Sequence, residues 1–136
     1  MLSEETISAF LQARSLAVFG VSRDPEKYGY KVYRTLKEKG VRVFAVNPRA
    51  QEVDGDPVYP NLQALPEVPE AIVTVVPPEV TKAVVAEALA AGIRKVWMQP
   101  GSEHEEAVRQ AQEAGAIVVH GGPCIMVVAT THLRSS

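Results

Sequence analysis

Five short segments of the sequence combine glycine or proline with small polar groups, and each one follows a short apolar run. In chain order they are Gly20-Val21-Ser22-Arg23, Asn47-Pro48-Arg49, Val76-Pro77-Pro78, Gln99-Pro100-Gly101 and His120-Gly121-Gly122. Strand ends need turn residues in any case, so a single segment of this kind is weak evidence for a site. Together, the five segments would present backbone groups and small polar side chains along one rim, which suits a nucleotide.

The first segment opens a stretch that is typical of phosphate-binding α/β proteins. Gly20 ends an apolar run, and helical spacing of apolar residues begins near Lys27. Backbone N–H groups at a helix N-terminus bind anions, and Gly20 would let the backbone approach a ligand. Arg23 and Lys27 could add positive charge toward phosphates. Known fingerprints are absent, because Ser22 and Pro25 stand where a dinucleotide motif needs glycine, and no Gly-Lys-Ser/Thr sequence enters the helix.

The second segment bears on which nucleotide could bind. A ribose-binding site for NAD usually has Asp or Glu at this point, about 20 residues after the glycine loop. The sequence instead has Asn47, with Arg49 close by. A neutral amide and a nearby guanidinium would tolerate a phosphate on the ribose, which a carboxylate would repel.

The apolar runs predict five strands that alternate with helices. We expect these strands at residues 15–20, 41–46, 71–76, 95–98 and 116–119, and a turn signal within 51–59 could belong to a small hairpin. The five strands are short and lack a period of two, which favours a parallel sheet with helices on both faces. Right-handed crossovers then predict a single Rossmann-like, doubly wound α/β domain over residues 1–136, with a five-stranded parallel sheet in the order 3-2-1-4-5 and a switch point between strands 1 and 4.

Three local expectations concern the helices. Either the second helix begins near Gly29, or it begins around Lys27 or Tyr28, which we favour, and Gly29 permits close packing on the first strand. The third helix, over 79–91, is expected to turn Val80, Ala83, Val84 and Leu89 toward the core. Ser102 is expected to cap the fourth helix in a capping box.

The composition argues against several classes of function. A net charge of −2 gives no reason to expect a nucleic-acid partner. No apolar run approaches the roughly 20 residues that span a bilayer, and the N-terminus is unlike a signal peptide, so we expect a cytoplasmic protein without a membrane partner. The single cysteine excludes an internal disulfide. His104, His120 and His132 form no paired ligand spacing, so we expect no metal site.

The ordered set of segments resembles a known family. The segments concerned are Gly20-x-Ser22-x-x-Pro25-x-x-x-Gly29, Val46-Asn47-Pro48, Val76-Pro77-Pro78, Gln99-Pro100-Gly101 and the late Cys124. They resemble those of the small stand-alone CoA-binding proteins, which are similar to the N-terminal CoA-binding domain of the succinyl-CoA synthetase alpha subunit. The resemblance extends over nearly the whole chain, from about Phe10 to Cys124.

This resemblance implies a Rossmann-like fold that holds coenzyme A by its ADP portion across the strand ends. Relatives often have Asp-Arg before the late cysteine, whereas Gly122-Pro123 stand there in this sequence, so no role is carried over to that segment. Carried over position by position, and with Lys27 added for its charge, the candidate cofactor-binding residues are Gly20, Val21, Ser22, Arg23, Lys27, Asn47, Pro48, Arg49, Val76, Pro77, Pro78, Gln99, Pro100 and Gly101.

We therefore expect a protein that binds coenzyme A or an acyl-CoA as a small-molecule ligand and has no catalytic machinery of its own. The synthetase needs a phosphorylated histidine from a second domain, and only residues 123–136 follow the segment at the end of the fifth expected strand. Two alternatives stay open. One is an NAD(P)-binding redox or sensor domain, which Ser22, Pro25 and Asn47 disfavour. The other is a small acyl-CoA enzyme that uses Cys124 or His120.

Overall fold

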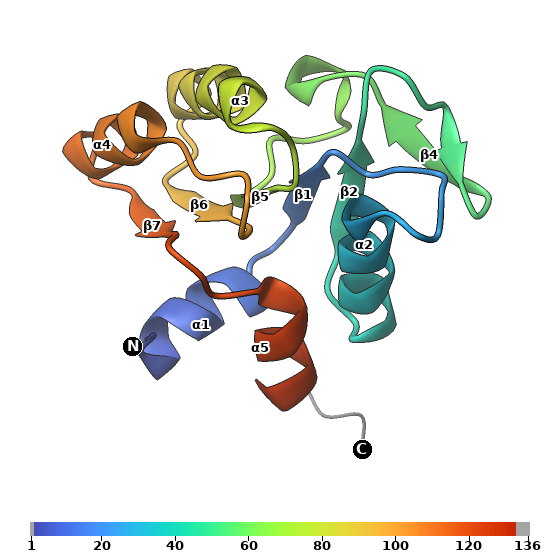
Figure 1. The fold of residues 1–136 in the computed structure, drawn as a ribbon, viewed down its shortest axis with the longest axis horizontal. Helices are drawn as coiled ribbons and strands as arrows, with labels where there is room; N and C mark the ends of the chain where they lie inside the picture. The colour runs from blue at the N-terminus through green and yellow to red at the C-terminus, as the bar shows by residue number, and fades with distance from the viewer. Residues whose placement is uncertain (1, 133–136) are drawn as a thin grey trace.

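The computed structural model describes residues 2–132, in which strands alternate with helices (Figure 1). The helices are α1 (Glu4–Leu11), α2 (Tyr28–Glu38), α3 (Pro78–Ala90), α4 (Glu105–Glu113) and α5 (Ile125–His132), with a 3-10 turn η1 (Leu62–Ala64). The strands are β1 (Leu16–Phe19), β2 (Val43–Val46), β3 (Glu52–Val53), β4 (Asp56–Tyr59), β5 (Ala71–Thr74), β6 (Lys95–Met98) and β7 (Ile117–Val119). None of these helices combines the length and the apolar character that crossing a membrane requires.

The strands of residues 2–132 form a seven-stranded sheet in the order β3-β4-β2-β1-β5-β6-β7. Six of them run parallel, and β3 pairs antiparallel with β4 in a small hairpin. The predicted α/β alternation is confirmed, and the sheet is mainly parallel. The predicted five-stranded, purely parallel sheet in the order 3-2-1-4-5 is wrong.

The error in strand order concerns the strand predicted at 71–76, which corresponds to β5. The predicted order places this strand at an edge beside β2, whereas β5 pairs with β1 on one side and with β6 on the other. All four residues of β5 are buried, as the centre of a sheet requires. The partly exposed β4 takes the place beside β2. The switch point therefore lies between β1 and β5.

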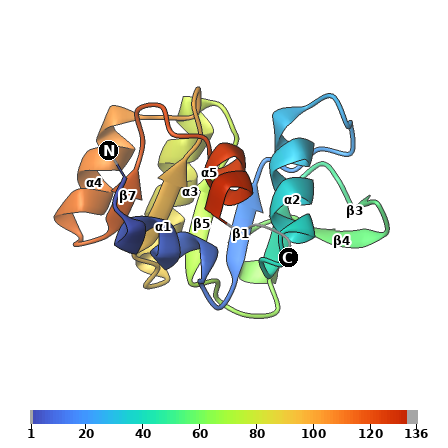
Figure 2. The same ribbon diagram turned by 90° about the horizontal axis from the view of Figure 1, so that it is seen from below.

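Helices cover both faces of the sheet, and each face has its own apolar core. Helices α1, α2 and α5 pack on one face through residues such as Phe10, Leu36 and Ile125 (Figure 2). Helices α3 and α4 pack on the other face through residues such as Val85 and Ala111. This two-sided cover fixes the strands and leaves their carboxyl ends to carry the loops that matter for a ligand.

The expected cap of the fourth helix is wrong. His104 is the N-cap residue of α4, and its Nδ1 accepts a hydrogen bond from a first-turn backbone N–H at 3.4 Å. Ser102 is buried instead, with its hydroxyl 2.8 Å from the Gln99 carbonyl oxygen and 3.0 Å from that of Thr74. Because these carbonyls lie at the ends of β5 and β6, Ser102 holds the two strand ends together.

Candidate functional site

The carboxyl ends of β1, β2 and β5 surround a cleft with a volume of about 810 Å³. One wall comes from the loop after β1 and the first turn of α2, and a second wall comes from the end of β2. Residues 75–77, which follow β5, form the floor beside α3. The cleft lies next to the switch point, where open α/β sheets bind their ligands.

Gly20 and Gly29 bring β1, β5 and α2 together by direct backbone contact. Gly20 has a φ of +102°, and a Cβ there would lie 2.2 Å from the Val75 carbonyl oxygen. A Cβ on Gly29 would lie 1.9 Å from the Gly20 carbonyl oxygen. The close packing predicted for Gly29 is therefore confirmed. Gly20 is required by its own backbone conformation and by Val75, so glycine at this position is explained without a ligand.

The backbone donors around this loop are only partly available to a ligand. The N–H groups of Gly20 and Val21 both donate to the Val46 carbonyl oxygen, at 2.9 and 3.3 Å. Helix α2 begins after Lys27, whose side chain makes no capping hydrogen bond. Lys31 donates its N–H to the Lys27 carbonyl oxygen at 3.2 Å, whereas the N–H groups of residues 28–30 have no acceptor within residues 2–132, and the helix dipole adds partial positive charge there. The first turn of α2, and not Gly20, offers the donors for an anion.

Asn47 at the end of β2 uses both ends of its side-chain amide within the protein. Its Nδ2 donates to the Val21 carbonyl oxygen at 2.8 Å. Its Oδ1 accepts a hydrogen bond from the Arg49 backbone N–H at 2.8 Å. The side chain therefore connects the loop after β1 to the turn after β2, and it forms part of the wall of the cleft.

Charged side chains line the cleft on opposite sides. Lys27 and Arg49 lie on the side of α2 and β2, and Glu87 lies on α3. Within residues 2–132, neither Lys27 nor Arg49 makes an ion pair. Both cations therefore keep their charge available to an anionic group in the cleft.

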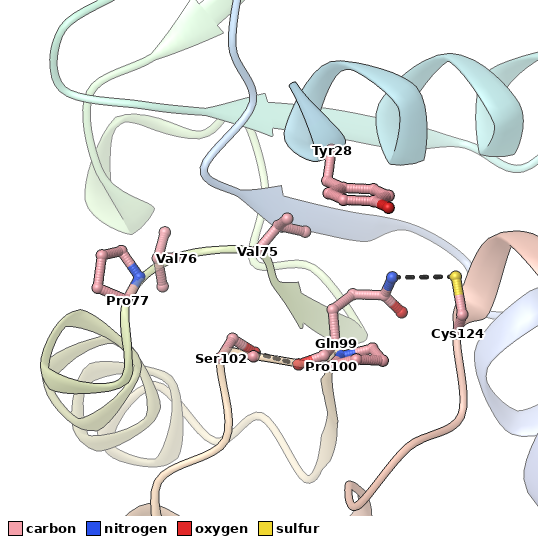
Figure 3. Close-up of a pocket in the computed structure, with 9 residues that line it drawn as sticks. Tyr28, Val75, Val76, Pro77, Gln99, Pro100, Ser102 and Cys124 are labelled. Carbon is pink, nitrogen blue, oxygen red and sulfur yellow. Dashed lines mark hydrogen bonds between the residues drawn. The ribbon is translucent and has the colours of Figure 1, made fainter. Parts of the chain in front are cut away.

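A second cavity, of about 480 Å³, adjoins the cleft and differs from it in character (Figure 3). The residues that line both cavities are Tyr28, Val75, Val76 and Pro77. The pocket is completed by Gln99, Pro100, Gly101, Ser102 and Cys124. Its lining is largely apolar and contains no charged side chain. Figure 3 shows Tyr28 on one side of this pocket, opposite Pro100 and Ser102.

Gln99 connects the end of β6 to the residues that begin α5, on the side of the pocket where Cys124 lies. Its side chain is buried, and its Nε2 donates to the Cys124 sulfur at 3.3 Å (Figure 3). Its Oε1 accepts a hydrogen bond from the Ile125 backbone N–H at 2.7 Å, which joins the end of β6 to the start of α5. Cys124 is partly exposed. His120 lines a different hollow, beside Glu103 and Glu106, so the two groups of the alternative enzymatic hypothesis do not share a cavity.

Most of the predicted contact residues line one of the two cavities. Those in the cleft are Gly20, Ser22, Lys27, Asn47, Pro48, Arg49, Val76 and Pro77. The predicted residues in the pocket are Val76, Pro77, Gln99, Pro100 and Gly101. Three predicted residues line neither cavity: Val21 is buried, Arg23 is exposed in its loop, and Pro78 is an exposed residue that opens α3.

Sequence reasoning missed Tyr28 and the cleft-facing side of α3. Tyr28 is 68% exposed. It directly follows the predicted phosphate loop, and this position in the sequence could have identified it as a candidate contact residue.

Of the α3 residues predicted to face the core, Val80 and Ala83 are exposed and line the cleft, so the prediction is wrong for these two. Val84 and Leu89 are partly buried and pack against the core of this face, and Val84 also lines the cleft. The fully buried residues of α3 are Thr81, Val85 and Ala88. Apolar residues occur on both sides of this helix, so the sequence pattern does not show which side packs on the sheet.

Side chains that ligate metals do not gather within residues 2–132. No group of three or more His, Cys, Asp or Glu side chains there could hold a metal ion. The candidate site therefore consists of the cation-bearing cleft and the uncharged pocket beside it.

Comparisons with known proteins show which family this chain belongs to. A family model described as a CoA binding domain matches residues 14–130. The alpha subunit of the ADP-forming acetate–CoA ligase II of Pyrococcus furiosus is 31% identical over 134 residues, which cover 90% of this chain and 29% of that subunit. An ADP-forming acetate–CoA ligase I of Archaeoglobus fulgidus is 27% identical, over 85% of this chain and 18% of the ligase. The chain thus spans less than a third of the length of these relatives.

Solved structures include relatives of similar length to this chain. A hypothetical protein of Pyrococcus horikoshii OT3 has a TM-score of 0.88 and 32% identity, covering 98% of this chain and 94% of that one. A conserved hypothetical protein of Pyrococcus furiosus has a TM-score of 0.78 and 42% identity, covering 84% and 97%. The family model covers most of the sequence, so the resemblance inferred from the strand-end segments is confirmed: this chain belongs to the CoA-binding domain family.

Proposed function

We propose that this protein binds coenzyme A, or an acyl-CoA, in the cleft and the adjoining pocket. The observation that carries the proposal is the separation of charge between the two cavities. Lys27 and Arg49 line the cleft, whereas no charged side chain lines the pocket. Coenzyme A has the same division, because its phosphates lie on the ADP portion and its pantetheine arm is neutral. Membership of the CoA-binding domain family supports the same ligand.

The ADP portion would occupy the cleft. Arg49 and Lys27 would offset the charge of the phosphates, and the first-turn N–H groups of α2 would donate hydrogen bonds to a phosphate. Glu87 lies on the α3 side of the cleft, so it would keep phosphates toward α2 and β2. This assignment keeps most of the predicted contacts and moves the main anion donors from Gly20 to the start of α2.

The pantetheine arm would extend into the pocket between Tyr28 and the end of β6. The Tyr28 ring lines both cavities and is mostly exposed, so a ligand that crosses from one cavity to the other would bury part of it. The thiol or acyl end would lie among Val75, Pro100 and Cys124. Such a lining suits a neutral chain better than a second charged nucleotide.

We further propose that the bound ligand undergoes no chemistry on this protein. Nucleophilic catalysis by cysteine needs a thiolate and normally a nearby base. The hydrogen-bond partner of the Cys124 sulfur is the neutral amide of Gln99, and His120 lines a different cavity. The ligase relatives extend well beyond the part that matches this chain, and the ligase activity belongs to those longer proteins.

The decisive experiment is a binding panel with free CoA, acetyl-CoA, NAD, NADP and ATP, read by thermal unfolding and by calorimetry. A ligand at 100 times its Kd that binds only the folded state adds about 2.7 kcal/mol of stability. We expect CoA and acetyl-CoA to raise the melting temperature by several degrees and NAD to leave it unchanged. Stabilisation by NAD without stabilisation by CoA would overturn the proposal.

Release of free thiol from acetyl-CoA, measured with the wild type and with Cys124→Ser, tests the absence of chemistry. We expect both proteins to bind CoA with similar affinity and neither to hydrolyse acetyl-CoA above the buffer rate. Turnover by the wild type that disappears in Cys124→Ser would identify a cysteine-dependent enzyme.

A further inference from the structure

Asn47 occupies the position at the end of β2 from which a Rossmann-type domain usually contacts a ribose. In this protein the side chain turns its polar atoms inward. Nδ2 donates to the Val21 carbonyl oxygen and Oδ1 accepts from the Arg49 N–H, each at 2.8 Å. The side chain thus has an internal partner at each end, which fixes its orientation and leaves one Nδ2 hydrogen and one Oδ1 lone pair.

Among the common side chains of similar size, only an amide can make both contacts at once. The Val21 carbonyl needs a donor, and the Arg49 N–H needs an acceptor. Aspartate would satisfy the Arg49 N–H but would place its second carboxylate oxygen against the Val21 carbonyl, which is repulsive. Leucine or alanine would leave both backbone groups without these partners. The identity of the residue is therefore set by the two loops that it joins.

The turn after β2 depends on this bridge. Pro48 follows Asn47, and the Ala50 N–H donates to the Asn47 carbonyl oxygen at 3.4 Å, which closes a turn with Arg49 inside it. The hydrogen bond from the Arg49 N–H to Asn47 Oδ1 stabilises the same turn through the Asn47 side chain. Arg49 lines the cleft and has no ion-pair partner within residues 2–132. Its guanidinium is therefore the charged group at this strand end that can meet an anionic ligand.

We propose that Asn47 is a positioning residue that places Arg49 for a phosphate on the ribose of the ligand, and that the pair selects nucleotides with a phosphorylated ribose. This inference rests on the proposed function and extends it, because it predicts a preference for CoA over 3′-dephospho-CoA. It also predicts that restoring a carboxylate at position 47 does not create an NAD site.

The test compares CoA and 3′-dephospho-CoA by calorimetry on the wild type, Asn47→Ala, Arg49→Ala and the double variant. A charge-assisted hydrogen bond contributes about 1.5–3 kcal/mol, so each single variant should lose roughly tenfold or more in affinity for CoA. Both should bind 3′-dephospho-CoA about as well as the wild type. If Asn47 acts through Arg49, the double variant should lose little beyond either single one. Independent, additive losses in the double variant would overturn the positioning role.

Asn61→Ala is a matched control for these variants. Asn61 also lines the cleft, but among residues 2–132 its side chain accepts a hydrogen bond from the Ala64 N–H alone, at 3.0 Å, as the N-cap of η1. We expect this variant to keep the wild-type preference for CoA over 3′-dephospho-CoA. Loss of the preference in Asn61→Ala would show that any disturbance of the cleft abolishes it, and the assignment to Asn47 would fail. Asn47→Asp should bind CoA weakly and NAD not at all, and a gain of NAD binding would overturn the inference.

Amide hydrogen exchange on the ligand-free proteins separates this inference from the proposed function. The Arg49 N–H should exchange faster in Asn47→Ala than in the wild type, whereas it should not in Asn61→Ala. If the wild type binds neither CoA nor 3′-dephospho-CoA, the proposed function fails and the ribose preference fails with it. An unchanged exchange rate of the Arg49 N–H in folded Asn47→Ala would refute the bridge itself, whatever the protein binds.

Discussion

The first turn of α2 and the outer face of the same helix are attached to the protein by different forces. At the first turn, Gly29 meets the Gly20 backbone so closely that no methyl group would fit between them. On the outer face, the Tyr33 hydroxyl donates to the Asp56 carboxylate at 2.8 Å, and Lys37 forms an ion pair with the same carboxylate. Asp56 belongs to the hairpin of β3 and β4, which lies beside α2 (Figure 1).

Because of this difference, the position of the cleft-lining end of α2 does not depend on the ion pairs on the rest of the helix. A steric contact between backbones does not depend on pH or on salt, and it fixes the end of α2 that lines the cleft. Ion pairs at a partly exposed surface are screened by salt and change with protonation. The ion pairs hold the body of the helix on the hairpin, away from the cleft.

Gly29→Ala should have the largest effect. The added Cβ would lie 1.9 Å from the Gly20 carbonyl oxygen, so the helix must move, at about 3 kcal/mol. Because the first turn of α2 lines the cleft, we also expect CoA binding to be lost. Gly40→Ala, just beyond the other end of α2, is the control. It has a φ of +86° and open space around it, so it should cost only about 1 kcal/mol and leave binding intact. Equal losses of stability in the two variants, measured by urea unfolding, would contradict the steric account.

Asp56→Asn should have an intermediate effect of roughly 1 kcal/mol. It removes the charge that pairs with Lys37 and weakens the hydrogen bond from the buried Tyr33. Asp54→Asn is the matched control on the same hairpin. Asp54 accepts from the more exposed Tyr30 hydroxyl at 2.6 Å, and we expect a loss of only a few tenths of a kcal/mol. Both variants should bind CoA as the wild type does, and weaker binding by either would show that the hairpin is coupled to the cleft.

The pH dependence of stability should separate the two attachments further. Hydrogen bonds from Lys37 and then Tyr33 lower the pKa of Asp56 below its usual 3.8. Its stabilising contribution is therefore present above that value and is lost as the pH falls below it. Burial, and then the hydrogen bond to Asp56, raises the pKa of Tyr33 above 10. The contribution of Tyr33 is therefore present below pH 10 and is lost at higher pH.

Thermal unfolding between pH 2 and pH 7 measures the acidic limb of this prediction. The difference in stability between the wild type and Asp56→Asn should shrink as the pH falls below 3.8, because the carboxylate takes up a proton in the unfolded state first and, at still lower pH, in the folded protein as well. The difference between the wild type and Gly29→Ala should persist over the same range. A difference for Asp56→Asn that stays constant down to pH 2 would argue against the assigned pKa shift.

Tyr28→Ala should have the smallest effect on stability. The side chain is 68% exposed, and its nearby cation is Lys31, with Nζ 5.5 Å from the centre of the ring. We expect melting temperatures within a degree or so of the wild type but several-fold weaker CoA binding, because the ring lines both cavities. Tyr28→Phe should bind normally. Unchanged CoA affinity in Tyr28→Ala would show that Tyr28 does not contact the ligand and that the pantetheine arm binds elsewhere.

The sequence alone determined the local structure and the family. Apolar runs located the strands that became β1, β2, β5, β6 and β7, and the glycine near the start of α2 was correctly interpreted as a packing position. The strand-end segments pointed to the CoA-binding family, and the family model confirms it. These features could be predicted because they depend on short-range rules, namely hydrophobic periodicity, turn residues and backbone conformation.

The order of the strands, the buried side of α3 and the hydrogen-bond partners of Asn47 depend on the tertiary fold. The position of β5 depends on which strands can pair on both of its edges. Strand β4 contains Asp56 and Pro57 and is only partly buried, so its pairing with β2 could not be predicted from an apolar run. Helix α3 has apolar residues on two sides, and packing chooses between them. The partners of Asn47 lie on two separate loops. Each of these features is a contact between segments that are distant in the sequence or on different loops, and a local sequence pattern does not encode such partners.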